Sequence, residues 1–364
     1  MKCIPLLKKM HMRIYKCIFL LFFSCQSPKQ LDIVPEYSLQ HKILLDDNFV
    51  IGKVRSMVLM DDSIPIVVDI QSNKVFQVLD YRKQDVRNYG GWGQGPDEFL
   101  FPTALSVWKG HTVACWDMNK RRYSAIQLAP EDSVAQFRHL FETHDSLFHY
   151  EIFPVRNGQF IAAGIYQNYR LVVLDKEGCF TKGFGTCPYR NDEERNISGN
   201  IRSEVYQGKL AVNPSGTRLV HALLRADIFS FYDIASNGDL HLAAEHIRSY
   251  PDYQYDSGAM ELSAPIYYLD VCATERYAYV LYSGKNYKAA KDKAFVGKII
   301  KVYDWEGRHV RNLNLDIEIQ NMCVSPDDGK IYAIAFQPNP ILVSFDMDSI
   351  YPAKDGKQIV LNNK

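Results

Sequence analysis

The chain has 364 residues, of which 47% are hydrophobic and 13% aromatic, enough for a sizeable core and too many for a disordered chain. The 42 lysine and arginine residues balance the 42 aspartate and glutamate residues. Residues 1–24 hold five basic residues and no acidic one, so the chain without residues 1–24 has 37 basic and 42 acidic residues, a net charge of −5. An acidic balance argues against nucleic acid as a partner, because such binding depends on neutralising phosphates.

The first segment in chain order is predicted to be a secretion signal, residues 1–24. Basic residues precede an apolar run at 17–23, which is far shorter than the roughly 20 residues that cross a bilayer. Leu21-Phe22-Phe23-Ser24-Cys25 resembles the lipobox of bacterial lipoproteins, which implies that Cys25 becomes the lipidated first residue and that 25–36 form a tether. An ordinary secretion signal with an incidental cysteine is the alternative.

The rest of the chain repeats one pattern six times: an apolar step, a short polar turn and an apolar β-rich run. The spacings between copies are 49, 48, 57, 59 and 53 residues. A period near 50 predicts a closed array of small sheets. The copies begin at Val58, Val107, Val155, Val212, Val271 and Val324.

Each copy continues through a second β-run, frequently an Asp- and Gly-containing turn, and a further β-run, so each unit is predicted to hold four antiparallel strands. Six such units predict an all-β fold, a six-bladed β-propeller spanning 37–364. A sandwich is the simpler rival, but it does not explain six copies. The most apolar runs, 64–68 and 331–336, are expected to be inner strands.

Closure of the ring is predicted from its two ends. An unpaired β-run at 37–45 precedes the first copy and should pair into the last blade, and another β-run follows at 358–362. The units are lengthened at 183–206, 248–263 and 283–297, and these long connections should share one face. Binding is usually carried by such loops, so that face is the expected functional one.

A glycine-rich stretch, GGWGQGPDEF at 90–99, lies between the first and second copies. It lacks the Lys-Ser/Thr that ends a phosphate-binding P-loop, so a structural turn is predicted. In that turn Glu98 should accept backbone hydrogen bonds and Phe99 should anchor the loop, around Gly93, Gly95 and Pro96.

This GxGPxEF stretch, the lipobox, the six repeats and the SPDDGK turn at 325–330 resemble the six-bladed β-propeller lipoproteins of Gram-negative bacteria that are often described as TolB-like. The resemblance implies an envelope lipoprotein, expected in the outer membrane facing the periplasm, that acts as a binding or assembly module. It implies no established catalytic residues.

Other candidate sites in the sequence are weak. Cys179 and Cys187 flank a turn and could pair. The histidines at 139, 144 and 149 are expected to be solvated or hydrogen-bonded, and no catalytic motif such as GxSxG or HExxH is present.

The sequence therefore favours a lipid-anchored, cofactor-free binding or scaffold module for a protein or a glycan. Basic and aromatic residues between the middle strands could stack on a sugar or clamp a carboxylate. These candidates are Arg121, Arg122, Tyr166, Tyr169, Arg170, Arg225 and Tyr287. The alternative is a metal-dependent hydrolase of the lactonase type, which requires carboxylates from different blades to converge at the channel mouth. Its candidate ligands are Asp69, Asp117 and Asp227.

Overall fold

The computed structural model describes residues 34–109, 112–128, 135–348 and 350. The predicted signal at 1–24, the lipidation residue Cys25, most of the tether and the β-run at 358–362 lie outside these residues. Within the described part of the chain, no helix is both long and apolar enough to cross a membrane.

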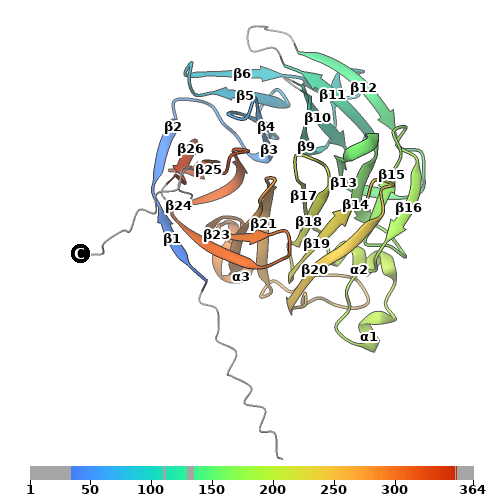
Figure 1. The fold of residues 1–364 in the computed structure, drawn as a ribbon. Helices are drawn as coiled ribbons and strands as arrows, with labels where there is room; N and C mark the ends of the chain where they lie inside the picture. Colours follow the sequence, from blue (N-terminus) through green and yellow to red (C-terminus); the bar gives the residue numbers. More distant parts are fainter. Residues whose placement is uncertain (1–33, 110–111, 129–134, 349, 351–364) are drawn as a thin grey trace, which may run out of the picture. The chain divides into compact units, whose positions relative to one another are not determined.

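Four sheets, each of four antiparallel strands in chain order, form blades 1 to 4 (Figure 1). Blade 1 consists of β3 (Val54–Met60), β4 (Ile64–Asp69), β5 (Phe76–Asp80) and β6 (Asp85–Tyr89). Blade 2 consists of β9 (Pro102–Lys109), β10 (Thr112–Asp117), β11 (Arg122–Gln127) and β12 (Gln136–Glu142). Blade 3 consists of β13 (Phe148–Pro154), β14 (Phe160–Ile165), β15 (Leu171–Leu174) and β16 (Phe180–Phe184). Blade 4 consists of β17 (Gly208–Val212), β18 (Arg218–Leu223), β19 (Asp227–Ile234) and β20 (Leu240–Ser249).

Blades 5 and 6 are joined through one 16-residue strand, β24 (His309–Val324). Its first half pairs with β23 as the outer strand of blade 5, and its second half pairs with β25 as the first strand of blade 6. No glycine or proline interrupts 309–324, so the strand runs on from one blade into the next. Blade 5 begins with β21 (Pro265–Ala273), β22 (Tyr277–Asn286) and β23 (Gly297–Asp304). Blade 6 continues with β25 (Lys330–Phe336), β26 (Pro340–Asp346) and β2 (His41–Leu45).

The first strands of the six blades contact one another in a closed cycle, β3–β9–β13–β17–β21–β24 and back to β3. The predicted six-bladed propeller is therefore confirmed. The expectation that 64–68 and 331–336 are inner strands was wrong, because they form β4 and β25, the second strands of their blades. A second strand is covered by strands on both sides and by the neighbouring blades, so it is the most apolar, whereas a first strand also faces the channel.

The ring closes through the N-terminal strand. β2 pairs antiparallel with β26, where His41 lies opposite Phe345, and Leu45 is fully buried in the core between blades 6 and 1. The preceding strand β1 (Glu36–Leu39) pairs with a different blade: it lies parallel to the first half of β24 and adds an outer strand to blade 5. The predicted closure is confirmed for 41–45, while the front of the predicted run belongs to the neighbouring blade.

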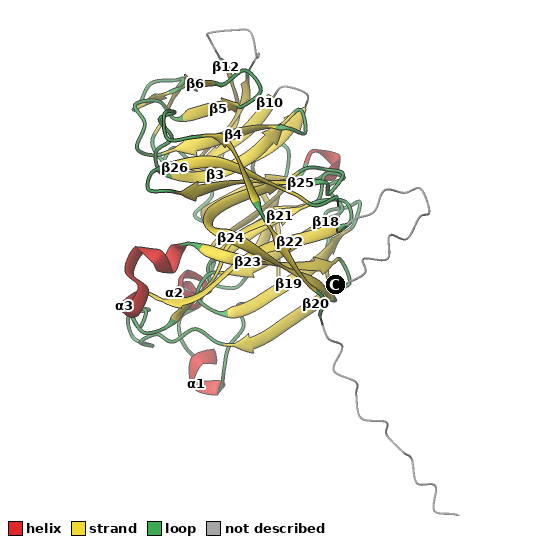
Figure 2. Ribbon diagram, turned by 90° about the vertical axis from the view of Figure 1, so that its left-hand side faces the viewer, coloured by secondary structure: helices red, strands yellow, loops and turns green. Residues whose placement is uncertain are grey.

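Two of the three long connections, the first and the third, carry short helices, and these helices lie on one side of the blades (Figure 2). Residues 185–207 contain α1 (Asp192–Arg195) and α2 (Gly199–Val205), and 287–295 contain α3 (Tyr287–Ala290) and η2 (Lys291–Phe295). An apolar cluster joins the first two connections, with Val205 and Tyr253 buried in it, and the Lys288 amide donates to the Leu262 carbonyl of the second connection at 2.9 Å. The turn η1 (Arg156–Gly158) lies on the opposite side.

The glycine-rich stretch forms a compact turn between blades 1 and 2. β7 (Gly91–Trp92) and β8 (Glu98–Phe99) form a short parallel bridge, and Glu98 Oε2 accepts the Gly95 amide at 2.7 Å. Phe99 is buried against Phe76, with ring centroids 4.9 Å apart. At Gly93 the φ angle is +149° and an added Cβ would lie 2.2 Å from Glu98 Oε2, so the closed turn requires glycine there.

The cysteines of the described chain are all free. Cys179, which is exposed, and Cys187, which is buried, are both among them, so the structure does not pair these two residues.

Candidate ligand-binding site

Each blade directs a polar or irregular segment of its first strand towards the channel. In five of the six first strands the pairing register skips one residue there, which is a β-bulge. A bulge leaves the extra residue unpaired and changes the direction of its side chain. The five skipped residues all line the same cavity. They are Arg55, Thr103, Tyr150, Leu269 and Gln320.

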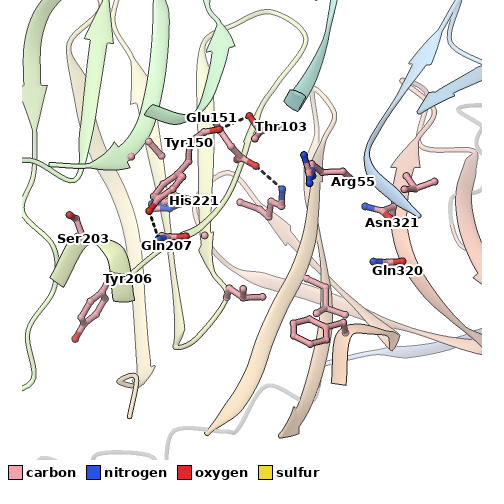
Figure 3. A pocket seen from close by; sticks show the side chains of 18 of the residues that line it. Arg55, Thr103, Tyr150, Glu151, Ser203, Tyr206, Gln207, His221, Gln320 and Asn321 are labelled. Carbon is pink, nitrogen blue, oxygen red and sulfur yellow. Dashed lines mark hydrogen bonds and ion pairs between the residues drawn. The ribbon is translucent and has the colours of Figure 1, made fainter. Parts of the chain in front are cut away.

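This cavity has a volume of about 490 Å³ and lies towards the face that carries the long connections, which contribute to its lining. Figure 3 shows side chains that line it. All six blades contribute to its lining, together with Ser203 and Tyr206 from the α2 segment and Phe295 from η2. Its volume lies within the range of small-molecule sites, about 300–1,000 Å³. The same face is the one on which the sequence predicted binding.

The charge of the lining is mainly positive. Among the described residues that border the cavity, Lys53, Arg55, Arg170 and Lys209 are basic and Glu151 is acidic. Arg55 forms no ion pair with a carboxylate of the described residues; its Nη1 donates to the Pro102 carbonyl at 3.2 Å and its guanidinium lies 3.7 Å from the Phe101 ring centroid. Arg55 is half-buried, and this burial lowers its pKa.

An ion pair between blades 3 and 4 lies where the first cavity borders a second one. Lys209 Nζ donates to Glu151 Oε1 at 2.7 Å, and Glu151 Oε2 accepts the Leu210 amide at 3.1 Å. Burial disfavours the ammonium, but the attraction of Glu151 and Asp270 outweighs it and raises the pKa of Lys209. Arg55, Glu151 and Lys209 also border a second cavity of about 570 Å³ on the opposite face, so they separate the two mouths.

Asp270 lies on the side of the second cavity. Its carboxylate accepts the amides of Met322 at 2.9 Å and Val271 at 3.0 Å, which ties blade 5 to blade 6. Burial raises the pKa of Asp270 to about 6, against the opposing attraction of Lys209 and these two amides.

The first cavity also reaches outward between blades 3 and 4. Its wall there contains Ala163, Gly164 and Gly208, none of which has a side chain larger than a methyl group. Arg170 and His221, 6% and 3% exposed, line this part. Arg170 Nε donates to His221 Nδ1 at 3.3 Å and Nη1 donates to Glu245 Oε1 at 2.6 Å.

Two donors of this pair have no acceptor among the described residues. In the described structure, Arg170 Nη2 and His221 Nε2 are buried without a hydrogen-bond partner. Burial, reinforced by the neighbouring guanidinium of Arg170, lowers the pKa of His221 well below its usual value, so the ring is neutral. Since Nδ1 accepts from Arg170, the proton of the neutral ring is on Nε2.

Of the seven predicted ligand-binding residues, Arg170 lines the cavity. Arg121 Nη2 donates to Asp145 Oδ1 at 3.0 Å and Arg122 Nε donates to Glu142 Oε1 at 3.0 Å, both within the outer part of the fold. Tyr166 is buried and its hydroxyl lies 2.6 Å from His149 Nδ1.

The remaining three predicted residues lie in the connections of the loop face. Tyr169 stacks on Phe180, and burial lowers the pKa of the half-buried Arg225. Tyr287 begins α3 and its ring centroid lies 6.1 Å from that of Phe295, which lines the cavity.

The three aspartates predicted as metal ligands bond to local partners. Asp69 accepts the amides of Gly52, Gln71 and Ser72, and Asp117 accepts those of Leu100, Phe101, Asn119 and Lys120. Asp227 accepts the Tyr268 hydroxyl. Within the described residues, no group of three or more His, Cys, Asp or Glu side chains is placed to hold a metal ion.

The channel residues were missed by the sequence reasoning, although a signal for them exists. A polar residue precedes the opening valine of five of the six repeats by three or four positions. These residues are Arg55, Thr103, Glu151, Lys209 and Asn321.

Comparison with known proteins identifies the family to which the fold corresponds. The family model described as TolB-like 6-blade propeller-like matches residues 36–327. No curated protein matches the chain.

Three solved structures illustrate the likeness. The calcium-binding protein regucalcin from Agrobacterium tumefaciens strain C58 has 9% identity and a TM-score of 0.51, covering 86% of this chain and 95% of that one. A gluconolactonase from Xanthomonas campestris has 10% identity and a TM-score of 0.52, covering 84% and 89%. A protein described as exported from Bacteroides fragilis NCTC 9343 has 14% identity and a TM-score of 0.51, covering 85% and 98%. At these identities the likeness concerns the fold alone.

Proposed function

We propose that this chain, which belongs to the TolB-like six-bladed propeller family, is a binding module of the cell envelope. Its ligand is an anionic group of a glycan or protein partner, held in the cavity on the loop-bearing face. The observation that carries this proposal is the lining of four basic side chains and one acidic side chain among the described residues, in a cavity of about 490 Å³.

The form of the cavity favours a glycan over a folded protein surface. It is concave, and the amide side chains of Gln207, Gln320 and Asn321 surround it. Gln207 Nε2 donates to the Tyr150 hydroxyl at 2.6 Å, which holds both side chains in place at the rim. Amides, a phenol and cations are the groups that recognise a hydroxyl-rich, negatively charged small ligand.

Attachment to the membrane belongs to the same proposal. The lipobox-like Leu21–Cys25 segment supports lipidation of Cys25, which would place the propeller in the outer membrane facing the periplasm. Labelling with a fatty-acid analogue tests this: Cys25→Ala should abolish the label and release the protein into the soluble periplasmic fraction. Retention of both the label and the membrane association by this variant would refute the anchor.

The binding function is tested with a panel of neutral, carboxylated and phosphorylated monosaccharides and acidic peptides, using isothermal titration calorimetry. Lys53 is exposed at the cavity and is changed to glutamate, while Lys176→Glu, in an exposed turn of blade 3, is the matched control. We expect at least one anionic compound to bind, with an affinity that falls about tenfold in Lys53→Glu and is unchanged in Lys176→Glu. Equal binding by both variants, or no binding of any anion, would contradict the proposal.

A further inference from the structure

We propose that Arg170 and His221 form a carboxylate-binding subsite between blades 3 and 4, so that the ligand is a carboxylated sugar of the uronic acid class. This inference rests on the proposed function and specifies where its negative group lies. The subsite is distinct from the Arg55, Glu151 and Lys209 side chains that border both cavities.

The guanidinium of Arg170 is fixed by two of its three donor nitrogens. Nε donates to His221 Nδ1 and Nη1 donates to Glu245 Oε1, which also accepts the Ser230 hydroxyl at 2.8 Å. Nη2 is the remaining donor nitrogen, and it lacks an acceptor in the described structure. A guanidinium clamped in this way has little rotational freedom left to lose when a ligand binds.

His221 supplies the second donor. Its Nδ1 accepts from Arg170, so its Nε2–H is the group left without an acceptor within the part of the chain that the structure describes. Buried donors are nearly always paired in proteins, because a donor that leaves water without finding an acceptor destabilises the fold. Two unpaired donors on adjacent, touching side chains that both border one cavity therefore call for an acceptor that enters from that cavity.

The backbone packs closely at this wall of the cavity. An added Cβ at Gly164 would lie 1.9 Å from the Phe148 carbonyl oxygen, and the two donor atoms are buried although their residues line the cavity, so a carboxylate reaches them by displacing the atoms that cover them. An added Cβ at Gly208 would lie 2.2 Å from the Ala222 carbonyl oxygen, so a larger residue cannot be placed there without moving β18.

The two donors fit a carboxylate better than a hydroxyl or a phosphate. A carboxylate presents two acceptor oxygens in one plane, which suits two adjacent N–H groups, whereas a single hydroxyl satisfies both poorly. Glu245 already offsets the charge of Arg170, so the net attraction comes from Lys53 and Arg55, which have no carboxylate partner within the described part of the chain. That modest excess favours a monoanion over a doubly charged phosphate.

The test compares matched ligand pairs on the full chain. Sodium glucuronate and glucose, and sodium galacturonate and galactose, are titrated calorimetrically, with glucose 6-phosphate and an acetylated glutamate dipeptide as further arms. We expect a uronate to bind at least tenfold more tightly than its neutral sugar and than the other two anions. His221→Leu should reduce this ratio to near one, His221→Gln, which keeps a donor, should restore part of it, and His139→Leu on outer strand β12 should leave it unchanged.

A measurement on the wild-type protein covers the case in which His221→Leu fails to fold. The imidazole Nε2–H resonance of His221 should shift on addition of glucuronate and not of glucose. An unshifted resonance, which would mean that only water occupies the donors, or a uronate preference that survives His221→Leu, would overturn the subsite. If another anion binds in a Lys53-dependent manner while the His221 variants change nothing, the subsite is refuted and the binding function stands. If no anion binds at all, both are refuted.

Discussion

Glu151 and Lys209 form an ion pair of 2.7 Å that joins the first strands of blades 3 and 4 across the channel wall. The same carboxylate accepts the Leu210 amide, so one side chain of blade 3 holds both the charge and the backbone of blade 4. Glu151 is 5% exposed, whereas about a third of the Lys209 side chain (31%) can be reached by solvent from the channel.

Removing the charge of Glu151 should destabilise the ring. In Glu151→Gln the Lys209 ammonium loses its nearest counterion. We therefore expect the free energy of unfolding at pH 7 to fall by about 2 kcal/mol. This loss is smaller than that from breaking a fully buried ion pair, because Lys209 is partly solvated. Urea unfolding measures this change. Glu177→Gln, which removes an exposed pair with Lys176, is the control and should change it by less than about 1 kcal/mol. Equal effects of the two variants would show that the inner pair does not stabilise the fold.

Asp270 should make stability depend on pH. Its pKa is about 6 in the folded protein against an ordinary value of 3.8, so between these values the folded state binds more protons than the unfolded state. The free energy of unfolding should therefore decrease as the pH rises from about 4 to 6, by about 2 kcal/mol from this group, and remain level above.

Asp270→Asn provides the comparison for this pH effect, because it removes the titration. Urea unfolding of both proteins at several pH values from 4 to 7 should show the wild type losing stability relative to the variant as the pH rises. Two parallel curves would show that Asp270 does not titrate in this range. A constant offset between the curves reflects only the altered hydrogen bonds to Met322 and Val271.

The closing strand should contribute strongly to the stability of the ring. Leu45 in β2 is fully buried between blades, and Leu45→Ala should lower the free energy of unfolding by about 3 kcal/mol through lost burial and the cavity left behind. Ile43 lies two residues away on the same strand and is 51% exposed, so Ile43→Ala should have a much smaller effect. Calorimetric unfolding temperatures compare the two, and similar losses would indicate that β2 is not packed as described.

Asp69 should act as a turn residue that needs no metal ion. Its carboxylate accepts three backbone amides, so Asp69→Ala should cost about 2–4 kcal/mol, because several buried amides lose an acceptor. The exposed Asp97→Ala is the control. Unfolding temperatures measured with millimolar calcium and with a chelator should be the same for the wild type. A calcium-dependent rise that disappears in Asp69→Ala would instead support the metal-dependent hydrolase.

Several features of the fold follow from local patterns in the sequence. The hairpin at 58–69 combines an apolar step, the Asp61–Asp62 turn and the apolar β4, and its recurrence near every 50 residues predicted the six blades. Which strand faces the channel could not be predicted in this way. Strand β4 is more apolar than β3 because it is enclosed on every side, and apolar composition alone does not distinguish enclosure by neighbours from proximity to the axis.

The candidate site was predicted at the level of a face and, among its residues, for Arg170. Arg121 and Arg122 have the same chemistry as Arg170 and occur in a similar connection, yet they bond to Asp145 and Glu142 away from the cavity. The difference depends on which strand of which neighbouring blade lies opposite each side chain.

The sequence by itself determined the units: where each hairpin turns, how many blades are built and which segment is free to close them, since these depend on neighbours within one repeat. Only the tertiary structure decided that Arg55, Glu151 and Lys209 all border both cavities and that His221 lies against Arg170, which is 51 residues away. Contacts between residues of different blades depend on the packing distance and rotation between the blades once the ring is closed. The two residues of such a contact lie too far apart in the sequence for a local sequence pattern to include both.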